Sequence, residues 1–417
     1  MLNAPFTIAF IAGQIVALSL AAQWTDVGGG TNAMVSAMHV HDGHLYVGGD
    51  FVQAGTLLTN DLARWDGAAW SSANPPFTVH VLNFLDFDGD LLSCGAGLGG
   101  GTTAVIEEVG GSWQVVGTNG PGFVYAMEEY QGELHAVGVS PWMRLSAGTW
   151  ITMGSAPSLR ALAKYQGDLI VAGSFTDFNG QPLNNIFRWN GSTLSPMGLG
   201  VLNGFVLRMV VYNNELYVGG GFDAAQGNAD NNLMKWNGTT WLPTYANIGH
   251  VWALDSLNGK LYCGDAGGNA RVWDGSSWTT LPSFNNRVED FEWFQGQLYA
   301  CGIFTMAGGT LALNIARMDA ETGWADAAPT AATLSVLPQP NNGLFQLNGL
   351  GSVTGPVRIT VTDLAGRIVS DRYTSGTTTV DMSNDNLSDG LYHLTLHTEE
   401  GIIGTTKLVI RKGTEGR

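Results

Sequence analysis

The chain has 417 residues, of which 45% are hydrophobic and 13% are charged, so it can bury a sizeable core and is not intrinsically disordered. Its 58 glycines and 14 tryptophans favour many short strands joined by tight turns over helices. The net charge of −17 argues against a nucleic-acid partner, which would need a basic surface.

Residues 8–22 are almost wholly apolar and end in small residues before Gln23. About 15 apolar residues are too few for an ordinary membrane-spanning helix, so residues 1–22 are interpreted as a secretory signal peptide. The absence of Lys and Arg before Arg64 departs from the usual signal-peptide pattern. The alternative is that this segment forms a buried or membrane-anchoring helix. If the signal peptide is cleaved, we expect no transmembrane segment in the mature chain.

A unit of about 42 residues then recurs along the chain. Each copy begins with an apolar-alternating stretch, a two-residue turn, and a second apolar stretch. Gly and Asn in these turns tolerate the positive φ of type I′ hairpins, so each copy is expected to begin with a β-hairpin. The turns are Asp42-Gly43, Asp88-Gly89, Gln131-Gly132, Gln166-Gly167, Asn213-Asn214, Asn258-Gly259 and Gln295-Gly296.

The second half of the unit predicts another hairpin, with an Asp-Gly or Asn-Gly turn between two aromatic strands. Trp65-Asp66-Gly67 followed by Trp70 shows the pattern, and copies two and three keep only its second Trp. Four antiparallel strands per copy predict an all-β, seven-bladed β-propeller over residues 23–325. Residues 23–28 resemble a fourth strand that closes the last blade, although residues 323–325 compete for that place.

The sequences Leu45-Tyr46-Val47-Gly48-Gly49 and Leu216-Tyr217-Val218-Gly219-Gly220, each followed by an Arg/Lys-Trp element, resemble the diglycine signature of kelch-type propellers. The resemblance covers residues 24 to about 325 and implies the fold. It leaves the function open, because such propellers include both enzymes and binding modules.

Residues 326–332 are small, contain one Pro and have no periodicity, which indicates a linker. Beyond them Val357, Ile359 and Val361 alternate with polar residues, as do Leu394 and Leu396. Residues 333–412 are therefore expected to form a small C-terminal β-sandwich, followed by a tail at 413–417. The charge excess stops at the same point, because residues 1–332 hold 11 basic and 27 acidic side chains whereas residues 333–417 hold 7 and 8.

This C-terminal module contains a series of landmark residues: Pro338, Pro340, Gly343, Gly366, Gly390, Tyr392, Lys407 and Lys412. In their order and spacing they resemble the type A sorting domain of the type IX secretion system of Gram-negative bacteria. Two features depart from the family pattern: Leu337-Pro338-Gln339-Pro340 replaces the usual Tyr-Pro-Asn-Pro, and residues 413–417 extend past the basic end. The resemblance implies passage through the periplasm, contact with the type IX machinery at the outer membrane, and a secreted or cell-surface product.

His39, His41 and His44 suggest a metal cluster, but aromatic residues fill the His41 position in most other copies, which favours a structural role. Asp86, Asp88 and Asp90 resemble part of a calcium loop without its closing Glu, and they also fit the expected hairpin turn. No metal or cofactor is therefore expected. Cys94, Cys263 and Cys301 are an odd number that favours buried free thiols over a disulfide.

Links of constant length follow the second strand in four copies, with thirteen positions from Phe51, Phe175, Phe222 and Phe304 to the next Arg or Lys. Loops on a rigid scaffold often carry recognition. Their candidate binding residues are Gln53, Asp177, Asn179, Gln181, Asp223, Gln226, Asn228 and Asp230. The alternative is that the constant length preserves one packed loop conformation.

No catalytic motif is recognisable, so the leading hypothesis is a secreted or surface propeller that binds an unknown extracellular ligand, a glycan or a protein. The rival is a carbohydrate-active or oxidative enzyme with a site in the central channel. Carboxylates or histidines converging in the channel would favour the enzyme, and a lining of small and apolar residues would favour the binder.

Overall fold

The computed structural model divides into two compact units, residues 1–324 and 325–417, and each is described by itself. The described residues are 23–73, 79–97, 104–139, 141–319, 335–337, 344–348, 356–362, 368–375, 379–381, 387–388, 390–398 and 401–411. The expected signal peptide, linker and tail therefore lie outside the described residues. Within them, no helix is both long enough and apolar enough to span a membrane.

The first unit is built from four-stranded antiparallel sheets, and seven are present in its described part. The first three are β2 (Val35–His41), β3 (His44–Gly49), β6 (Leu62–Trp65) and β7 (Trp70–Ser72); β8 (Val79–Phe87), β9 (Asp90–Gly97), β10 (Val105–Val109) and β11 (Ser112–Val115); and β12 (Val124–Tyr130), β13 (Glu133–Gly138), β14 (Trp142–Ser146) and β15 (Thr149–Gly154).

The fourth to sixth sheets follow in chain order. They are β16 (Ser158–Tyr165), β17 (Asp168–Ser174), β20 (Ile186–Trp189) and β21 (Leu194–Pro196); β22 (Gly204–Tyr212), β23 (Glu215–Phe222), β24 (Leu233–Trp236) and β25 (Trp241–Pro243); and β26 (Val251–Leu257), β27 (Lys260–Asp265), β28 (Ala270–Trp273) and β29 (Trp278–Thr280). The last sheet joins β30 (Val288–Phe294), β31 (Gln297–Gly302) and β34 (Ile315–Asp319) to β1 (Trp24–Asp26).

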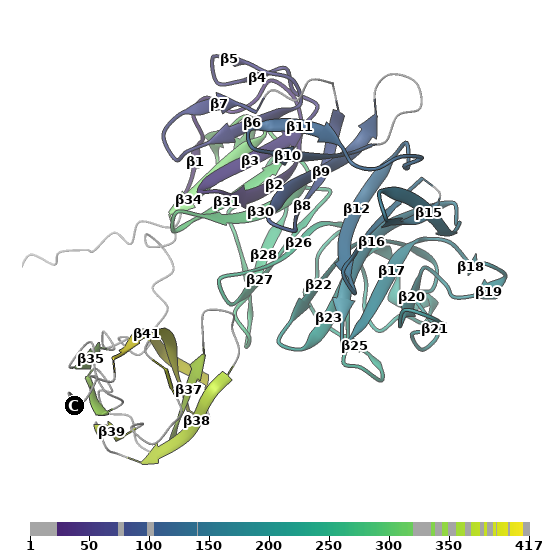
Figure 1. Ribbon diagram of the computed structural model, residues 1–417. Helices are drawn as coiled ribbons and strands as arrows, with labels where there is room; N and C mark the ends of the chain where they lie inside the picture. Colours follow the sequence, from purple (N-terminus) through teal and green to yellow (C-terminus); the bar gives the residue numbers. More distant parts are fainter. Residues whose placement is uncertain are drawn as a thin grey trace, which may run out of the picture. The chain divides into compact units, whose positions relative to one another are not determined.

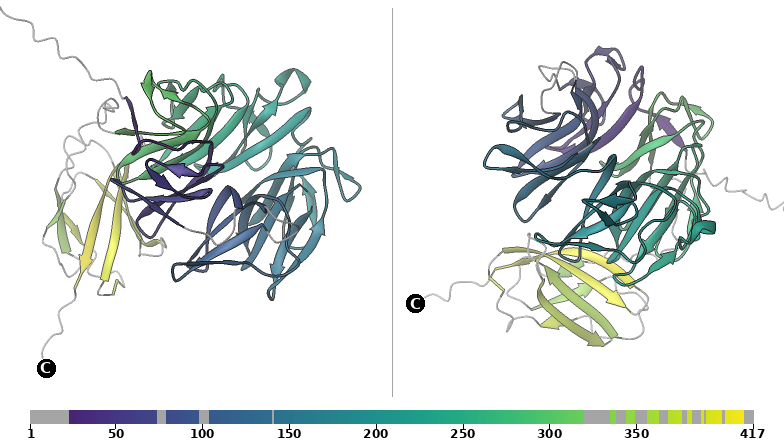
Figure 2. Two further views of the ribbon diagram at one scale, coloured as in Figure 1. Left: turned by 90° about the horizontal axis from the view of Figure 1, so that it is seen from above. Right: turned by 90° about the vertical axis from the view of Figure 1, so that its right-hand side faces the viewer.

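The first strand of each sheet packs against the first strands of the sheets before and after it. The series runs β2, β8, β12, β16, β22, β26, β30 and back to β2. These inner strands therefore form a closed ring around a central channel, with the other strands of each sheet outside them. In Figures 1 and 2 the purple first sheet and the green last sheet lie side by side, as this closure requires.

The hairpins that join the first and second strands have the predicted geometry. Asp42 and Gly43 have φ values of 45° and 73°, and Gln131 and Gly132 have 55° and 80°. Two consecutive positive φ angles are the mark of a type I′ turn, whose twist matches that of the strands. The second hairpins are longer: Trp65 pairs with Trp70, and Asp66 Oδ1 accepts hydrogen bonds from the backbone of Ala68 and Ala69.

The diglycine of the sequence pattern is needed for close packing. A Cβ on Gly48 would overlap the side chain of Val81 in the next sheet. A Cβ on Gly49 would overlap the carbonyl oxygen of Met34, the residue just before the inner strand of the same sheet. Neither position has room for a side chain, which explains why the second strands carry glycines among apolar residues.

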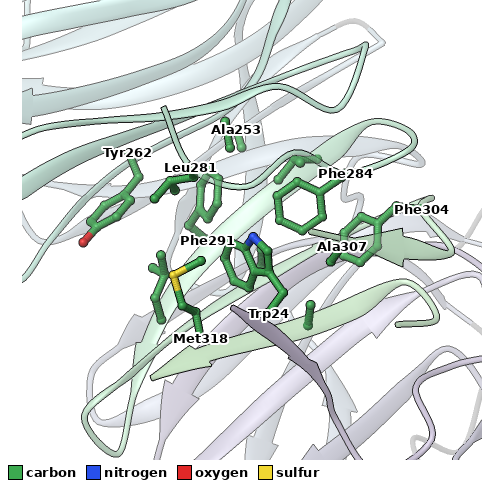
Figure 3. Packing of buried hydrophobic residues seen from close by; sticks show 14 of the residues in the cluster. Trp24, Ala253, Tyr262, Leu281, Phe284, Phe291, Phe304, Ala307 and Met318 are labelled. Carbon is green, nitrogen blue, oxygen red and sulfur yellow. The ribbon is translucent and has the colours of Figure 1, made fainter. Parts of the chain in front are cut away.

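Strand β1 closes the ring at the place that the sequence left open between two segments. Trp24 pairs with Met318, and Asp26 pairs with Ala316. The indole of Trp24 is fully buried and lies 4.9 Å, centroid to centroid, from the ring of Phe284 (Figure 3). The competing residues 323–325 lie outside the described part of the chain.

Neighbouring sheets are linked by the tryptophan of the fourth strand. Its indole Nε1 donates a hydrogen bond to a carbonyl that follows the fourth strand of the preceding sheet. The pairs are Trp24 with Pro282, Trp70 with Val27, Trp113 with Ala73, Trp150 with Val116, Trp241 with Met197, and Trp278 with Thr244. In β21 the corresponding position is Leu194, which pairs with Trp189 as Trp70 pairs with Trp65.

The links between second and third strands fold into small structures of their own. Three are two-stranded hairpins, formed by β4 (Gln53–Ala54) with β5 (Leu57–Leu58), β18 (Asp177–Phe178) with β19 (Gln181–Pro182), and β32 (Met306–Ala307) with β33 (Thr310–Leu311). The fourth contains the 3-10 helix η1 (Ala224–Gln226). All four begin at the end of the sheet where the inner strand starts, because Val35 pairs with Gly49 and Gly204 pairs with Phe222.

The second unit is a β-sandwich. One sheet contains β35 (Ser335–Leu337), β36 (Leu344–Asn348) and β39 (Thr379–Asp381), and the other contains β38 (Ile368–Ser375), β37 (Pro356–Thr362), β40 (Gly390–Thr398) and β41 (Gly401–Ile410). Val357, Ile359 and Val361 face the core together with Leu394 and Leu396. The alternation in the sequence therefore identified the buried face of this unit correctly.

Candidate functional site

All seven inner strands contain a β-bulge at the same point. In each of them the pairing with the second strand skips one residue, as between Val35 and Ala37 or between Leu159 and Ala161. An extra residue in a bulge is left out of the ladder, and its side chain can be turned aside. The skipped residues, which we call the bulge ring, are Ser36, Leu82, Tyr125, Arg160, Leu207, Trp252 and Glu289.

The bulge ring lines a hollow at the end of the channel where the inner strands begin. A cavity of about 100 Å³ is bounded by all seven ring residues together with Met34, Arg208 and Arg287. A second cavity of about 150 Å³ shares six of these lining residues and extends past Asn83, Asp255 and Asp290. The two hollows form one site, which we call the mouth cavity.

Two arginines of the mouth cavity stack on aromatic rings. The guanidinium carbon of Arg160 lies 3.8 Å from the ring centroid of Tyr125. That of Arg287 lies 4.0 Å from the ring centroid of Trp252. Cation–π stacking holds a guanidinium in place while leaving its edge able to donate hydrogen bonds.

Carboxylates do not neutralise these arginines equally. Arg287 forms a close ion pair with buried Glu289, whose other oxygen lies 3.9 Å from Arg208. Arg160 donates from Nε to Ser158 Oγ at 2.8 Å and has no carboxylate partner among the described ion pairs. Burial lowers the pKa of Arg160, and the nearby charge of Arg208 lowers it further. The smaller hollow is therefore lined by three arginines and one carboxylate.

Carboxyl groups converge deeper in the channel. Asp290 Oδ2 accepts a hydrogen bond of 2.6 Å from the backbone of Met38, and Asp255 Oδ2 accepts one of 3.3 Å from Phe291. Burial raises the pKa of Asp255 to about 7, although Arg208 opposes the shift. Burial raises the pKa of Asp290 well above its usual value, and that of Glu292 is raised by burial too. Each raised pKa increases the neutral fraction of its carboxyl near neutral pH, which weakens the carboxyl as a counterion for the arginines.

The eight predicted binding residues lie in the links on the same side of the sheets. Gln53 is in β4, and Asp177 and Gln181 are in the hairpin whose turn contains Asn179, with a φ of 51°. Asp223 caps η1, whereas the side chain of Gln226 lies outside the described part. None of the eight lines the mouth cavity as far as the structure describes it.

Several of these side chains support the backbone of their own links. Asn228 donates from Nδ2 to the carbonyl of Leu202 and accepts from its amide, and Asp230 accepts from the amides of Thr244 and Tyr245. Asp223 accepts from the amide of Ala225, and Gln53 donates to the carbonyl of Gly55. Such contacts favour the packed-loop alternative for these four positions.

The sequence reasoning missed the bulge ring. A signal was present, because the position six residues before each hairpin turn varies from Ser to Trp while the preceding position is always Val or Leu. Period-two alternation fails at a bulge, so the inward direction of these side chains could not be predicted from an unbroken strand.

The histidine and cysteine candidates have structural partners. His39 Nε2 and His41 Nδ1 lie 3.0 and 2.8 Å from the two oxygens of Asp86 in the next sheet. No set of three His, Cys, Asp or Glu side chains within the described ranges is placed to hold a metal ion. Cys94, Cys263 and Cys301 are buried free thiols, as expected, and burial raises the pKa of each.

The residues that carry the C-terminal resemblance are only partly described. Gly390 and Tyr392 lie in β40, where the Tyr392 hydroxyl donates to the carbonyl of Ser388 at 3.0 Å. Lys407 belongs to β41. Pro338, Pro340, Gly343, Gly366 and Lys412 lie outside the described residues.

Comparison with protein families identifies the second unit. Residues 335–411 match the family described as the secretion system C-terminal sorting domain. This unit is therefore a sorting domain, which confirms the resemblance seen in the sequence and indicates export through the type IX system to the cell surface or beyond. No protein with a curated description matches the chain.

Solved structures share the fold at low identity. The extracellular domains of the putative hybrid two component system BT4673 and of the putative one component system BT4673, both from B. thetaiotaomicron, are 11% identical, with TM-scores of 0.50 and 0.51. The matches cover 94% of this chain but only 59% and 58% of those chains, so it spans less than two thirds of their length. The WD40 β-propeller domain of Doa1 is 13% identical over 72% of this chain and 96% of its own, with a TM-score of 0.49. The described residues are nearly all β, and the ring of four-stranded sheets forms a β-propeller that is followed by a β-sandwich.

Proposed function

We propose that this protein is cargo of the type IX secretion machinery whose propeller binds an extracellular ligand, a glycan or a protein, at the mouth of its channel. The sorting domain supports the export half of the proposal. The observation that carries the binding half is the mouth cavity, where bulges in seven strands turn varied side chains towards one hollow. Concave sites with a few fixed polar groups are the usual form of ligand sites.

The links on the same side form the rim of this proposed site. Asp177 and Gln181 are exposed on the hairpin of β18 and β19, and no side-chain hydrogen bond of either is found among the described residues. They are the loop residues best suited to touch a ligand that extends from the cavity. Asn228 and Asp230 support that rim through the backbone.

An extracellular enzyme is the second candidate, and one observation favours it. Asp255, Asp290 and Glu292 converge in the channel, which is the arrangement expected of an acid–base site. A carboxyl with a pKa of about 7, as for Asp255, suits proton transfer at neutral pH. Against this, Asp255 and Asp290 already accept hydrogen bonds from backbone amides that join neighbouring sheets.

The test is a binding screen of the purified full chain against arrays of glycans and of extracellular proteins. Leu82 lines both hollows, so Leu82→Trp should fill the mouth cavity and weaken capture at least tenfold. Ile151→Trp, at a side chain that is 42% exposed in the outer strand β15, is the matched control and should bind normally. Equal binding by wild type and Leu82→Trp would contradict a site in the mouth cavity.

The same ligands separate the binder from the enzyme. Incubation followed by mass spectrometry should return the captured ligand unchanged if the propeller only binds. Product that appears with wild type and disappears with Asp255→Asn, while binding persists, would instead establish the enzyme.

A further inference from the structure

We infer that the mouth cavity selects a small ligand bearing a carboxylate, which binds between Arg160 and Arg208. The inference rests on the proposed binding function and names the chemistry that the same site would recognise.

The first argument is the local charge. Three guanidinium groups, those of Arg160, Arg208 and Arg287, line the hollow, and Glu289 is the one carboxylate described as paired with any of them. Arg160 lies at the rim without an acid, although residues 1–332 carry a large excess of acidic side chains. Acidic side chains are abundant in this part of the chain, yet none of the described ones pairs with Arg160. The charge of Arg160 is therefore available to an anion from outside the protein.

The second argument is the way Arg160 is held. Its flat face stacks on Tyr125, and its Nε donates to Ser158. These contacts use neither terminal nitrogen, so both remain able to donate to one ligand. A guanidinium with its edge presented in this way matches the two oxygens of a carboxylate.

The third argument is that the carboxyl groups deeper in the channel only partly neutralise the positive charge of the arginines. Asp255 and Asp290 border the larger hollow, and both carry raised pKa values because they are buried. With a pKa of about 7, Asp255 is only about half ionised near neutral pH, and the raised pKa of Asp290 increases its neutral fraction, so neither fully replaces an external anion. A protonated carboxyl can also donate a hydrogen bond to a ligand.

Size and charge favour a carboxylate over a phosphate. A volume of about 150 Å³ holds a group the size of one six-membered ring. Glu289 lies within 3.9 Å of Arg208, so a second negative charge on the ligand would be repelled. A singly charged planar group, as in a uronic acid or another small organic acid, meets both limits.

The experiment is isothermal titration of the full chain with three singly charged carboxylates, namely acetate, D-glucuronate and D-galacturonate. D-Glucose serves as the neutral counterpart of D-glucuronate, and inorganic phosphate and sulfate are the other anions. We expect at least one carboxylate to bind, D-glucose not to bind, and Arg160→Gln to weaken the binding by about tenfold or more. Arg144→Gln, which removes an arginine paired with Glu133 in another part of the propeller, should leave the binding unchanged.

The outcomes separate this inference from the proposed function. If no carboxylate binds but a neutral glycan or a protein does, and Leu82→Trp blocks it, the inference is overturned and the binding function stands. If phosphate or sulfate binds more tightly than every carboxylate, the carboxylate assignment is overturned as well. If no ligand of any kind depends on the mouth cavity, both proposals fall.

Discussion

Single polar side chains join neighbouring sheets of the propeller. Asn185, Asn232 and Asn314 each precede a third strand with positive φ, and each donates from Nδ2 to a carbonyl of the link that enters the next sheet. The backbone amide of Asp61 donates to the carbonyl of Phe51, just as the amide of Asn185 donates to the carbonyl of Phe175. It is thus the equivalent residue of the first sheet, but an ionised carboxylate cannot donate.

Replacing Asp61 with Asn should therefore stabilise the propeller at neutral pH. Burial raises the pKa of Asp61, with a contribution from Asp50 that outranks the opposing effect of His80. Because the folded state favours the protonated acid, ionisation destabilises the fold above that pKa. We expect Asp61→Asn to add about 1 kcal/mol at pH 7, a gain that shrinks as the pH falls through the pKa of folded Asp61.

Melting temperatures of wild type and Asp61→Asn between pH 4 and 8 measure this effect. Asn185→Asp is the reverse control, since it introduces an acid where the carbonyl of Val201 now accepts from an amide. It should destabilise at pH 7 and recover part of the loss on acidification. A gain from Asp61→Asn that stays constant with pH would show that Asp61 has the same pKa in the folded and the unfolded protein, so that burial does not raise it.

The residue scale also shows where the sequence was insufficient. Asp230 and Asn228 looked like binding residues because they are polar and lie in loops, yet a side chain that caps a backbone has the same composition signal. Arg160 and Arg208 lie in neighbouring sheets, and the packing of β16 against β22 brings them to one cavity. Functional residues that meet across blades cannot be paired from one sequence.

At the scale of strands, the sequence was more informative, because turns and alternation are local. The type I′ turns and the buried face of β37 were predicted from neighbouring residues alone. Ring closure was left between two segments, because each contains a tryptophan that could fill the same place. The structure places β1 beside β34, with the indole of Trp24 donating to Pro282 as the equivalent indoles do in other sheets.

Strand β1 is three residues long, so its contribution depends on Trp24. The indole is fully exposed to solvent in an unfolded chain but packs against Phe284 and neighbours in the closed ring (Figure 3). Trp24→Ala should therefore destabilise the propeller by about 3–5 kcal/mol. Trp24→Phe keeps most of the apolar contact but leaves the Pro282 carbonyl unpaired, and should cost about 1–3 kcal/mol.

Chemical denaturation monitored by far-UV circular dichroism measures both variants. Trp70→Ala is the comparison within a continuous sheet, because Trp70 is the same residue of the first sheet and is only partly buried. Trp70→Ala should lower the free energy of unfolding by less than Trp24→Ala does. An unchanged unfolding midpoint for Trp24→Ala would show that another segment closes the ring.

At the scale of the whole molecule, the repeat and the excess of acidic residues end in the same region of the chain. Both changes mark the boundary between two units with different functions. The propeller carries the acidic surface and the mouth cavity, whereas the sandwich is a sorting domain with its own core around Val361 and Leu394. Each unit was foreseeable because its pattern is repeated or family-specific. The ligand was not foreseeable, since no motif in either unit encodes it.

The separation into two units predicts that deleting the sorting domain abolishes export but leaves the propeller folded. A chain ending at Ala332 lacks the region that matches the sorting family, residues 335–411, and keeps all the sheets of the first unit. In a Gram-negative host with a type IX system, it should accumulate in the periplasm as a folded propeller. Its ligand binding should equal that of the full chain, because every residue described as lining the mouth cavity belongs to the first unit. Cell fractionation with an antibody to the propeller gives the measurement, and full-length Arg160→Gln is the control that should still reach the surface. Efficient appearance of the truncated chain at the surface or in the medium would refute the role of the sorting domain, whereas its degradation in the periplasm would show that the propeller needs the second unit to fold.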